Sequence, residues 1–393
     1  MQVTRVKSFK KIGVQKTLDF EVNSKYHNFY AEGLVSSNSH AVSYGYVTAY
    51  TAYLKAKYPL HFFTAALNNA QNEAEPIEEI KAIQSELIHF GIKLLPPSLS
   101  KSNSKFTIEG SDIRFPLSNI KGISDKTLSH LENFKIENAN KFQIFSSAKE
   151  AGVPINVLCS LILVGAMDEK IHSTRTRLVM EACLWNLLTD NEKKYAFSFA
   201  EAYNFDLITL FKALHSTEKN IKGKQIISDK RMETIKKKFA PYNEIYRQNS
   251  KNEKLACFYF EKELLGYSYS HTLYDLYKEK CSDLNKISEI KGALPKERFK
   301  IIGQVTECKA SVSKNGNKYI QVRVNGHDGS VKCMLFQGKN ADRIEDHEEV
   351  NGRVVKDDDI VICRGSKQDD DTLFVDNISI QDTEVFLKIR KLK

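Results

Sequence analysis

The chain has 393 residues, 41% of them hydrophobic and 27% charged, which is the balance of a folded protein with about two to four domains. Its formal net charge of +9 favours polyanionic partners. The longest nearly unbroken apolar run, Val157 to Met167, is about half of a membrane span, and no charged-then-apolar segment opens the chain. We therefore expect a cytoplasmic protein that does not enter a membrane.

Seven cysteines are widely spaced along the chain and form no Cys-x-x-Cys pair. This spacing argues against a zinc ribbon and against a disulfide framework. It predicts reduced thiols in the core.

The first predicted elements are short strands. Within residues 1–38, apolar and polar residues alternate as they do in strands, and Gly13 and Asn23–Ser24 supply turns. So short a segment cannot bury a core of its own and needs a partner. From Ser43 onward tyrosines recur at helical spacing, which predicts a helix that stops before Pro59.

Helical patterns continue through the middle of the chain. A helix is predicted from Pro76 to Phe90, and Gly91 suits its C-terminal cap because glycine adopts the left-handed conformation readily. Residues 113–168 indicate short helices joined by tight turns, and residues 170–280 indicate mainly polar helices. The basic run Lys236–Lys238 is better explained as a solvated helix face than as a dedicated site.

From Phe299 onward, apolar residues recur at every second position, which predicts strands. The five strand candidates are Phe299–Ala310, Lys318–Val324, Ser330–Phe336, Asp359–Gly365 and Thr372–Ile380. Asn315–Gly316 and Asp328–Gly329 mark hairpin turns, and a polar helical stretch, Asn340–Glu349, separates the third and fourth candidates. Three strands, a helix and two strands over about eighty residues is the order of an OB-fold.

The stretch that ends at Asn38 carries the groups needed to break one peptide bond and make another. Asn38 has a side-chain amide that can attack its own carbonyl, Ser39 has a hydroxyl that can carry an acyl group, and His27 can move protons. Singly, each has an ordinary explanation, because asparagine–serine is a common turn pair and a histidine among aromatic residues is usually packed. Together, in this order and spacing, they indicate splicing chemistry.

Residues 1–38 resemble the C-terminal half of a split intein. The resemblance rests on Leu18–Val22, on Tyr26–Gly33 and on the Asn38–Ser39 boundary. It implies that Ser39 accepts an acyl group from a separate intein N-half and that Asn38 then cyclises and cuts the bond before Ser39.

The same resemblance gives His27 the task of assisting the cyclisation and Asp19 that of assisting earlier steps, with no cofactor. Ser37 stands where the family commonly has histidine, which moves more of the proton transfer to His27. The first splicing nucleophile is not in this chain, so the expected partner is an intein N-half fused to another protein portion.

From Ser39 the chain resembles the C-terminal part of the bacterial DNA polymerase III alpha subunit. The matching residues are Ser39–Tyr44, Thr51–Pro59, Phe90–Pro97, Ile113–Ile123 and Glu261–Tyr267. The sliding clamp is a further candidate partner, although no clamp-binding peptide stands out.

The two resemblances together imply a multidomain α+β protein. Its expected parts are a β-rich intein fragment (1–38), the end of the polymerase fingers (39–112), a helix-hairpin-helix region (113–170), a mainly helical linker region (171–295) and an OB-fold barrel with a basic tail (296–393).

Several side chains are candidates for contacts with DNA primer-template or single-stranded DNA. Backbone N–H groups of the turn at Lys121–Gly122 can face phosphate without regard to sequence, although an ordinary helix–helix turn looks the same. In the barrel the candidates for stacking on bases are Tyr319, Phe336 and Phe374, and those for phosphate contacts are Lys314, Lys318, Arg323 and Lys332. Aromatic residues on strands more often belong to a core.

In the fingers match, His40, Lys55 and Lys57 are candidates for nucleotide or phosphate contacts, and plain surface charge explains the lysines equally well. Phosphoryl transfer needs clustered carboxylates that hold Mg²⁺, and the family keeps them in a palm that precedes the fingers. No such cluster precedes Ser39, and Asp369–Asp371 reads as a solvated hairpin. We therefore expect magnesium to be bound outside this chain and the chain alone to be inactive as a polymerase.

The leading prediction is thus a precursor that trans-splicing joins to its N-terminal half, giving a DNA-directed DNA polymerase. The alternative is a stand-alone nucleic-acid-binding protein with helix-hairpin-helix and OB modules.

Overall fold

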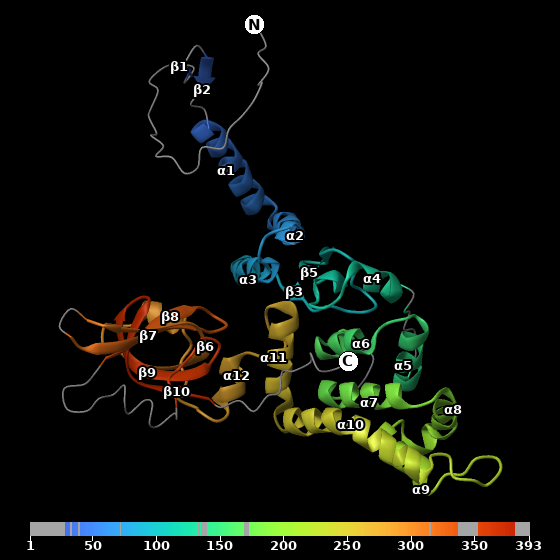
Figure 1. The fold of residues 1–393 in the computed structure, drawn as a ribbon. Helices are drawn as coiled ribbons and strands as arrows, with labels where there is room; N and C mark the ends of the chain where they lie inside the picture. The colour runs from blue at the N-terminus through green and yellow to red at the C-terminus, as the bar shows by residue number, and fades with distance from the viewer. Residues whose placement is uncertain are drawn as a thin grey trace. The chain divides into compact units, whose positions relative to one another are not determined.

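The computed structural model of the chain is shown in Figure 1. It describes residues 28–31, 34–37, 40–70, 72–132, 134, 140–168, 173–313, 316–336 and 353–381. The chain divides into two compact units, Met1–Phe63 and Thr64–Lys393.

The first unit contains a strand pair followed by a helix. Strands β1 (Asn28–Ala31) and β2 (Leu34–Ser37) pair antiparallel. Helix α1 (His40–Lys57) ends before Pro59, as predicted, and α2 (Pro59–Ala70) begins at that proline, which suits a first helical position because it has no N–H to leave unpaired. The other strands predicted within residues 1–38 lie outside the described residues.

The second unit begins with a helix and a small sheet. Helix α3 (Pro76–Leu87) continues into the 3-10 turn η1 (Ile88–Phe90) and is ended by Gly91 at a φ of 68°. This outcome confirms the predicted helix and its glycine cap. The sheet that follows has the order β3-β5-β4 and contains β3 (Leu94–Leu95), β4 (Thr107–Glu109) and β5 (Asp112–Arg114).

Helices make up the middle of the second unit. The first group is η2 (Leu117–Asn119), α4 (Asp125–Glu132), α5 (Lys141–Glu150) and α6 (Ile155–Leu163). The second group is α7 (Arg175–Leu187), α8 (Asp190–Phe199), η3 (Glu201–Tyr203), α9 (Leu207–Ser216), α10 (Asp229–Asn249), η4 (Ser250–Asn252), α11 (Glu253–Leu265), α12 (Leu273–Lys278) and α13 (Glu289–Gly292).

The long apolar run of the sequence is helix α6, which is buried from Val157 to Leu163. A helix that is apolar on all sides is stable in water only when other elements surround it. Aromatic packing next to it joins α5 to α7, since the rings of Phe142 and Trp185 stack with centroids 4.8 Å apart. Within the described ranges, no helix has the length and apolar character needed to cross a membrane.

The C-terminal part is a closed five-stranded barrel in the order β10-β8-β7-β6-β9. Its strands are β6 (Arg298–Val312), β7 (Lys318–Asn325), β8 (Ser330–Phe336), β9 (Ile360–Asp369) and β10 (Thr372–Ile380). All five predicted strands are therefore present, and the parallel pairing of β10 with β8 closes the barrel. The predicted helix at Asn340–Glu349 lies outside the described residues.

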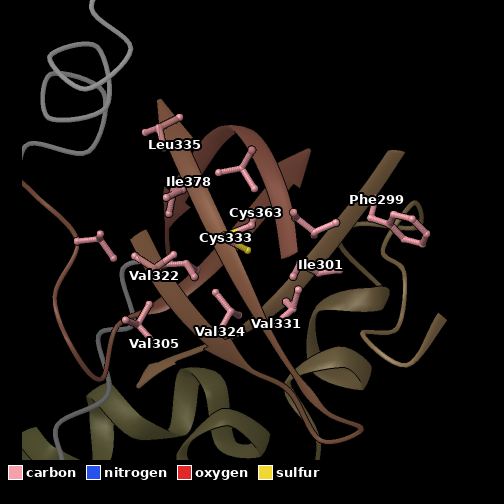
Figure 2. Packing of buried hydrophobic residues seen from close by; sticks show 14 of the residues in the cluster. Phe299, Ile301, Val305, Val322, Val324, Val331, Cys333, Leu335, Cys363 and Ile378 are labelled. Atoms are coloured by element: carbon pink, nitrogen blue, oxygen red, sulfur yellow. The ribbon is translucent and has the colours of Figure 1, made fainter. Parts of the chain in front are cut away.

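The barrel interior is filled by branched side chains and thiols. Figure 2 shows Val322, Cys333, Cys363 and Ile378 within this core, and each is essentially inaccessible to water. A Cβ added to Gly365 would lie 2.2 Å from the carbonyl oxygen of Phe374, so the close approach of β9 and β10 requires glycine there.

The cysteines agree with the sequence prediction of unpaired thiols. All seven are free, five are buried, and Cys281 and Cys308 are half-buried. Burial raises the pKa of the Cys257 thiol to about 12, so this thiol stays protonated at neutral pH.

Candidate nucleic-acid interface

Side chains on β7 and β8 alternate between the barrel interior and its outer surface. Along β7, Ile320, Val322 and Val324 are buried, and the residues between them are more exposed. Tyr319 stands opposite Phe336 on β8, and Arg323 stands opposite Lys332. Four of the candidates, Tyr319, Arg323, Lys332 and Phe336, therefore share the outer face, whereas Lys318 alternates in phase with the buried residues.

An aromatic cluster, formed by Tyr319, Phe336 and Phe374, crosses three strands of this face. The ring centroids of Tyr319 and Phe336 lie 5.7 Å apart, and those of Phe336 and Phe374 lie 5.0 Å apart in an edge-to-face arrangement. Phe374 is 37% exposed and the other two are half-buried. The cluster lies outside the barrel core, so its rings are available to a ligand.

Basic side chains flank the aromatic cluster. Arg323 and Lys332 are cross-strand neighbours, and Glu307 on β6 stands opposite Arg323. The hydrogen bond from Lys309 lowers the pKa of Glu307 and keeps that carboxylate charged. Lys309 was missed by the sequence reasoning, because only the strand register brings it to this face.

Lys318 is exposed at the start of β7, and Lys314 lies outside the described residues. The outer face of β7, β8 and β10, with the aromatic cluster, Arg323 and Lys332, is called the barrel face below. Such a face can stack bases on its rings and hold phosphates with its cations.

The turn before α4 is fixed to the end of α11. The backbone N–H of Lys121 donates to the carbonyl of Leu264 at 2.9 Å, and Lys121 Nζ lies 2.7 Å from Glu263 Oε1. Gly122 is exposed with a φ of 93°, and no atom lies within 4 Å of a Cβ built there. The ammonium of Lys121 thus already has a carboxylate partner, and its contact with phosphate stays a prediction.

Within the first unit, the two lysines of α1 lie near aromatic rings. Lys55 Nζ is 5.4 Å from the ring centroid of Phe63, and Lys57 Nζ is 5.5 Å from that of Tyr53. His40 is the first residue of α1. The predicted splicing residues His27, Asp19, Asn38 and Ser39 lie outside the described residues.

Among the residues that the structure describes, no three His, Cys, Asp or Glu side chains are grouped to hold a metal ion. The acidic run Asp369–Asp371 lies at the turn between β9 and β10, where Lys367 Nζ is 2.7 Å from Asp370 Oδ1.

A buried ion-pair network joins the helices that precede the barrel. Arg175 Nη1 donates to Glu261 Oε1, and Arg175 Nη2 donates to Asp168 Oδ2, each at 2.6 Å. Glu261 Oε2 accepts hydrogen bonds from the backbone N–H groups of Tyr269 and Ser270. The network attaches α7 to α11 and to the loop that follows it, and sequence reasoning missed it because its members are far apart in the chain.

Comparison with known proteins gives one motif match and several relatives. Residues 91–178 match the family described as "Helix-hairpin-helix motif". The DNA polymerase III subunit alpha of Aquifex aeolicus is 26% identical over 356 residues, which cover 89% of this chain and 25% of that protein. The protein of the same name from Halalkalibacterium halodurans is 27% identical over 303 residues, which cover 76% of this chain and 24% of that protein.

The protein of that name from Bacillus subtilis is 32% identical over 139 residues, 34% of this chain and 12% of its own length. The chain spans about a quarter of the length of the first two relatives. Over most of its length, then, this chain is homologous to proteins named DNA polymerase III subunit alpha, and it contains a helix-hairpin-helix motif.

Proposed function

We propose that this chain is the C-terminal portion of a replicative DNA polymerase III alpha subunit and that its barrel is an OB-fold that binds single-stranded DNA. The observation that carries the proposal is the barrel face, where an aromatic cluster lies beside the opposed pair Arg323 and Lys332. Aromatic rings stack on bases of any sequence, and cations follow the backbone, which is the combination that non-specific strand binding uses.

The direct test is a binding measurement on the full chain with a fluorescently labelled oligothymidylate and with a hairpin duplex of equal charge. We expect tighter binding of the single strand, because only unpaired bases can reach the rings of the barrel face. Binding of neither ligand, or equal binding of both at low salt, would contradict the proposal.

We further propose that the remaining polymerase portion supplies the catalytic carboxylates with their Mg²⁺ and covers helix α1. Support comes from the exposure of α1, where Tyr44, Tyr46 and Tyr50 are 66–68% exposed. Large apolar and aromatic side chains gathered on one exposed helix mark a surface that another protein covers. The fingers and sliding-clamp assignments, and the bounds 113–170 of the helix-hairpin-helix region, belong to the same proposal.

The joining reaction that we propose is trans-splicing through residues 1–38. The Ser39 hydroxyl attacks the acyl group at the end of the partner's N-terminal portion and forms an ester, releasing the intein N-half. The Asn38 side-chain nitrogen then attacks its own carbonyl carbon, which closes a succinimide and frees the amino group of Ser39. That amino group attacks the ester carbonyl and leaves a peptide bond, with His27 and Asp19 assisting the proton transfers.

Intact-mass measurement after co-expression with the matching N-half tests this reaction. We expect a ligated product that lacks residues 1–38, and a chain that stays at 44.8 kDa would contradict splicing. Ser39→Ala should block ligation, and Asn38→Ala should trap a branched species. Ser36→Ala is the control, since its hydroxyl is not at the junction and its removal should leave ligation intact.

Primer extension then tests the enzyme. The ligated product, supplied with Mg²⁺ and deoxynucleoside triphosphates, should extend a primer, whereas the unspliced chain alone should not. Extension by the unspliced chain would contradict the proposal that the other polymerase portion supplies the catalytic carboxylates.

A further inference from the structure

The segment that joins α9 to α10 forms a tight loop with an apolar side chain at its tip (Figure 1). Residues 219–225, Lys-Asn-Ile-Lys-Gly-Lys-Gln, are called the α9–α10 loop below. Lys219 and Gln225 pair in an antiparallel bridge, which closes the loop. Ile221 is 97% exposed, the largest fraction for any bulky hydrophobic side chain among the described residues. Its side chain therefore contributes nothing to the core.

Hydrogen bonds to Asn220 hold this loop in one shape. The backbone N–H of Asn220 donates to the carbonyl of Lys224, and that of Gly223 donates to the carbonyl of Asn220, each at 2.8 Å. Asn220 Oδ1 also accepts from the backbone N–H groups of Lys222 and Lys224, each at 2.9 Å. Gly223 has a φ of 72°, which glycine adopts readily. A loop fixed in this way loses little conformational entropy when a ligand binds to Ile221.

The base of the loop is attached to α9. Gln225 Nε2 donates to the carbonyl of His215 at 2.7 Å. The backbone N–H of Ile227 donates to the carbonyl of Leu214 at 3.1 Å, and the Ile227 side chain is buried. The packed helices therefore support the tip of the loop against a ligand.

The tip of the loop is cationic. Its three lysines, called the tip lysines, are Lys219, Lys222 and Lys224. All three are exposed, and none forms an ion pair among the described residues. The carboxylates that flank the loop have other partners: Glu218 Oε1 accepts from the hydroxyl of Tyr203 at 2.7 Å. Asp229 Oδ1 lies 2.9 Å from His215 Nε2.

An aliphatic side chain surrounded by cations suits a DNA duplex. Proteins of the minor groove insert side chains such as isoleucine or leucine between base steps and place lysines or arginines beside them. Single-strand binding instead relies on aromatic rings, and the α9–α10 loop contains none. The minor groove is about 6 Å wide, so a narrow turn can enter it where a helix cannot.

We propose that the α9–α10 loop binds duplex DNA through the minor groove, with Ile221 inserted between two adjacent base pairs and the tip lysines on the flanking phosphates. Insertion unstacks the two base pairs and bends the duplex at that step. Pyrimidine–purine steps such as TA unstack most readily, so the loop should favour them. No residue of the barrel face takes part, so a failure of single-strand binding would not affect this proposal.

The fluorescence of 2-aminopurine, which rises when the base is unstacked, detects the insertion. The full chain is titrated into a duplex that carries 2-aminopurine at a central TA step. We expect the fluorescence to rise with the natural chain and with Ile221→Leu, and to stay level with Ile221→Ala. The core is unaffected, since Ile221 is almost fully exposed. Ile88→Ala is the matched control, because Ile88 is 56% exposed in η1, and it should leave the rise intact.

Salt dependence tests the tip lysines. Each phosphate contact contributes about 0.9 to the slope of log affinity against log salt for a duplex. Replacing all three tip lysines by glutamine should therefore reduce the slope by about 2.7. The control replaces three other exposed lysines of the second unit by glutamine and should leave the slope nearly unchanged. These control residues are Lys93, Lys105 and Lys356.

Three results would overturn the proposal. The first is a fluorescence rise that Ile221→Ala retains in full, and the second is an equal loss of slope in the two triple variants. The third comes from polyglutamate as a probe. If replacement of the tip lysines weakened binding of polyglutamate as much as binding of the duplex, the loop would be a site for acidic peptides rather than for DNA.

Discussion

Arg175 Nη1 lies 2.6 Å from Glu261 Oε1, both side chains are buried, and 86 positions of the chain separate the two residues. Removing one member of a buried ion pair leaves the other charge without compensation, at a cost of about 3–5 kcal/mol. Because Asp168 stays paired with Arg175, Glu261→Gln should lower the free energy of unfolding by about 3 kcal/mol, the lower end of this range, in urea denaturation.

The control for this substitution is Glu279→Gln. Glu279 pairs with Lys254 at 3.9 Å, and both side chains are largely exposed. Surface changes of this kind stay within about 0.5 kcal/mol. Equal stability of the two variants would mean that the Arg175–Glu261 pair does not hold α7 to α11.

The aromatic cluster predicts a loss of single-strand affinity when one ring is removed. Phe374→Ala and Tyr319→Ala should each weaken binding of oligothymidylate by about 1–3 kcal/mol, the usual contribution of a stacked base. Fluorescence anisotropy measures the change. Phe90→Ala is the matched control, because Phe90 is 38% exposed and Phe374 is 37% exposed. If all three variants bind alike, no base stacks on the cluster.

The opposed pair Arg323 and Lys332 predicts a change in salt dependence. Each phosphate contact contributes about 0.7 to the slope of log affinity against log salt for a single strand. Arg323→Gln with Lys332→Gln should therefore reduce the slope by about 1.4. Lys237→Gln with Lys238→Gln removes the same charge from α10 and should leave the slope nearly unchanged. An equal reduction by both pairs would assign the effect to net charge alone.

The lowered pKa of Lys262 implies that its contribution to the free energy of unfolding rises with pH. Its pKa is lowered to about 8 by burial, whereas an unfolded chain keeps a lysine pKa of about 10.4. Between these values the unfolded chain binds more protons, so the free energy of unfolding increases with pH across that window.

Lys262→Met removes the buried charge and should stabilise the chain at pH 7, by an amount on the order of 3 kcal/mol. The difference from the natural chain should shrink as the pH rises and vanish above about pH 10.5. Thermal unfolding at several pH values measures this. Parallel profiles for the two proteins would show that Lys262 titrates normally in the folded state.

Alanine substitutions at two glycines with positive φ distinguish the cost of backbone strain from the cost of a steric clash. The Cβ of Gly122→Ala meets no atom within 4 Å, so the substitution should lower the free energy of unfolding only by the cost of holding alanine in the left-handed conformation, about 1–2 kcal/mol. Gly152→Ala has the same kind of φ, but its Cβ would lie 2.7 Å from His130 Nδ1. It should therefore be the more destabilising of the two in chemical denaturation. The reverse order would mean that the His130 ring moves aside freely.

The elements that the sequence predicted well are those set by local patterns. Alternation predicted the strand Lys318–Val324, and Ile320, Val322 and Val324 are buried on one side of it. Gly91 ended the helix that begins at Pro76 because its conformation is a property of the residue itself. Such signals need only a few neighbouring residues.

The remaining features depend on contacts between distant segments. Nothing near Lys121 indicates that Glu263 will hold its ammonium, and nothing near Gln304 indicates that its amide will donate to Asp358. Hydrophobic periodicity reports which side of an element is buried, but it does not report which partner covers that side. The basic residue Lys309 on β6 stands beside Gln321 on β7 for the same reason, through strand register.

The pairing of β10 with β8 has a consequence for assembly. Because the five described strands close on themselves, none of them offers a row of unpaired backbone groups to another chain. A second copy or an extended peptide cannot lengthen this sheet, so the outer surface can engage a partner through side chains only. In a chain that exposes the tyrosines of α1 before assembly, the barrel therefore does not add a sheet edge at which a second copy could pair.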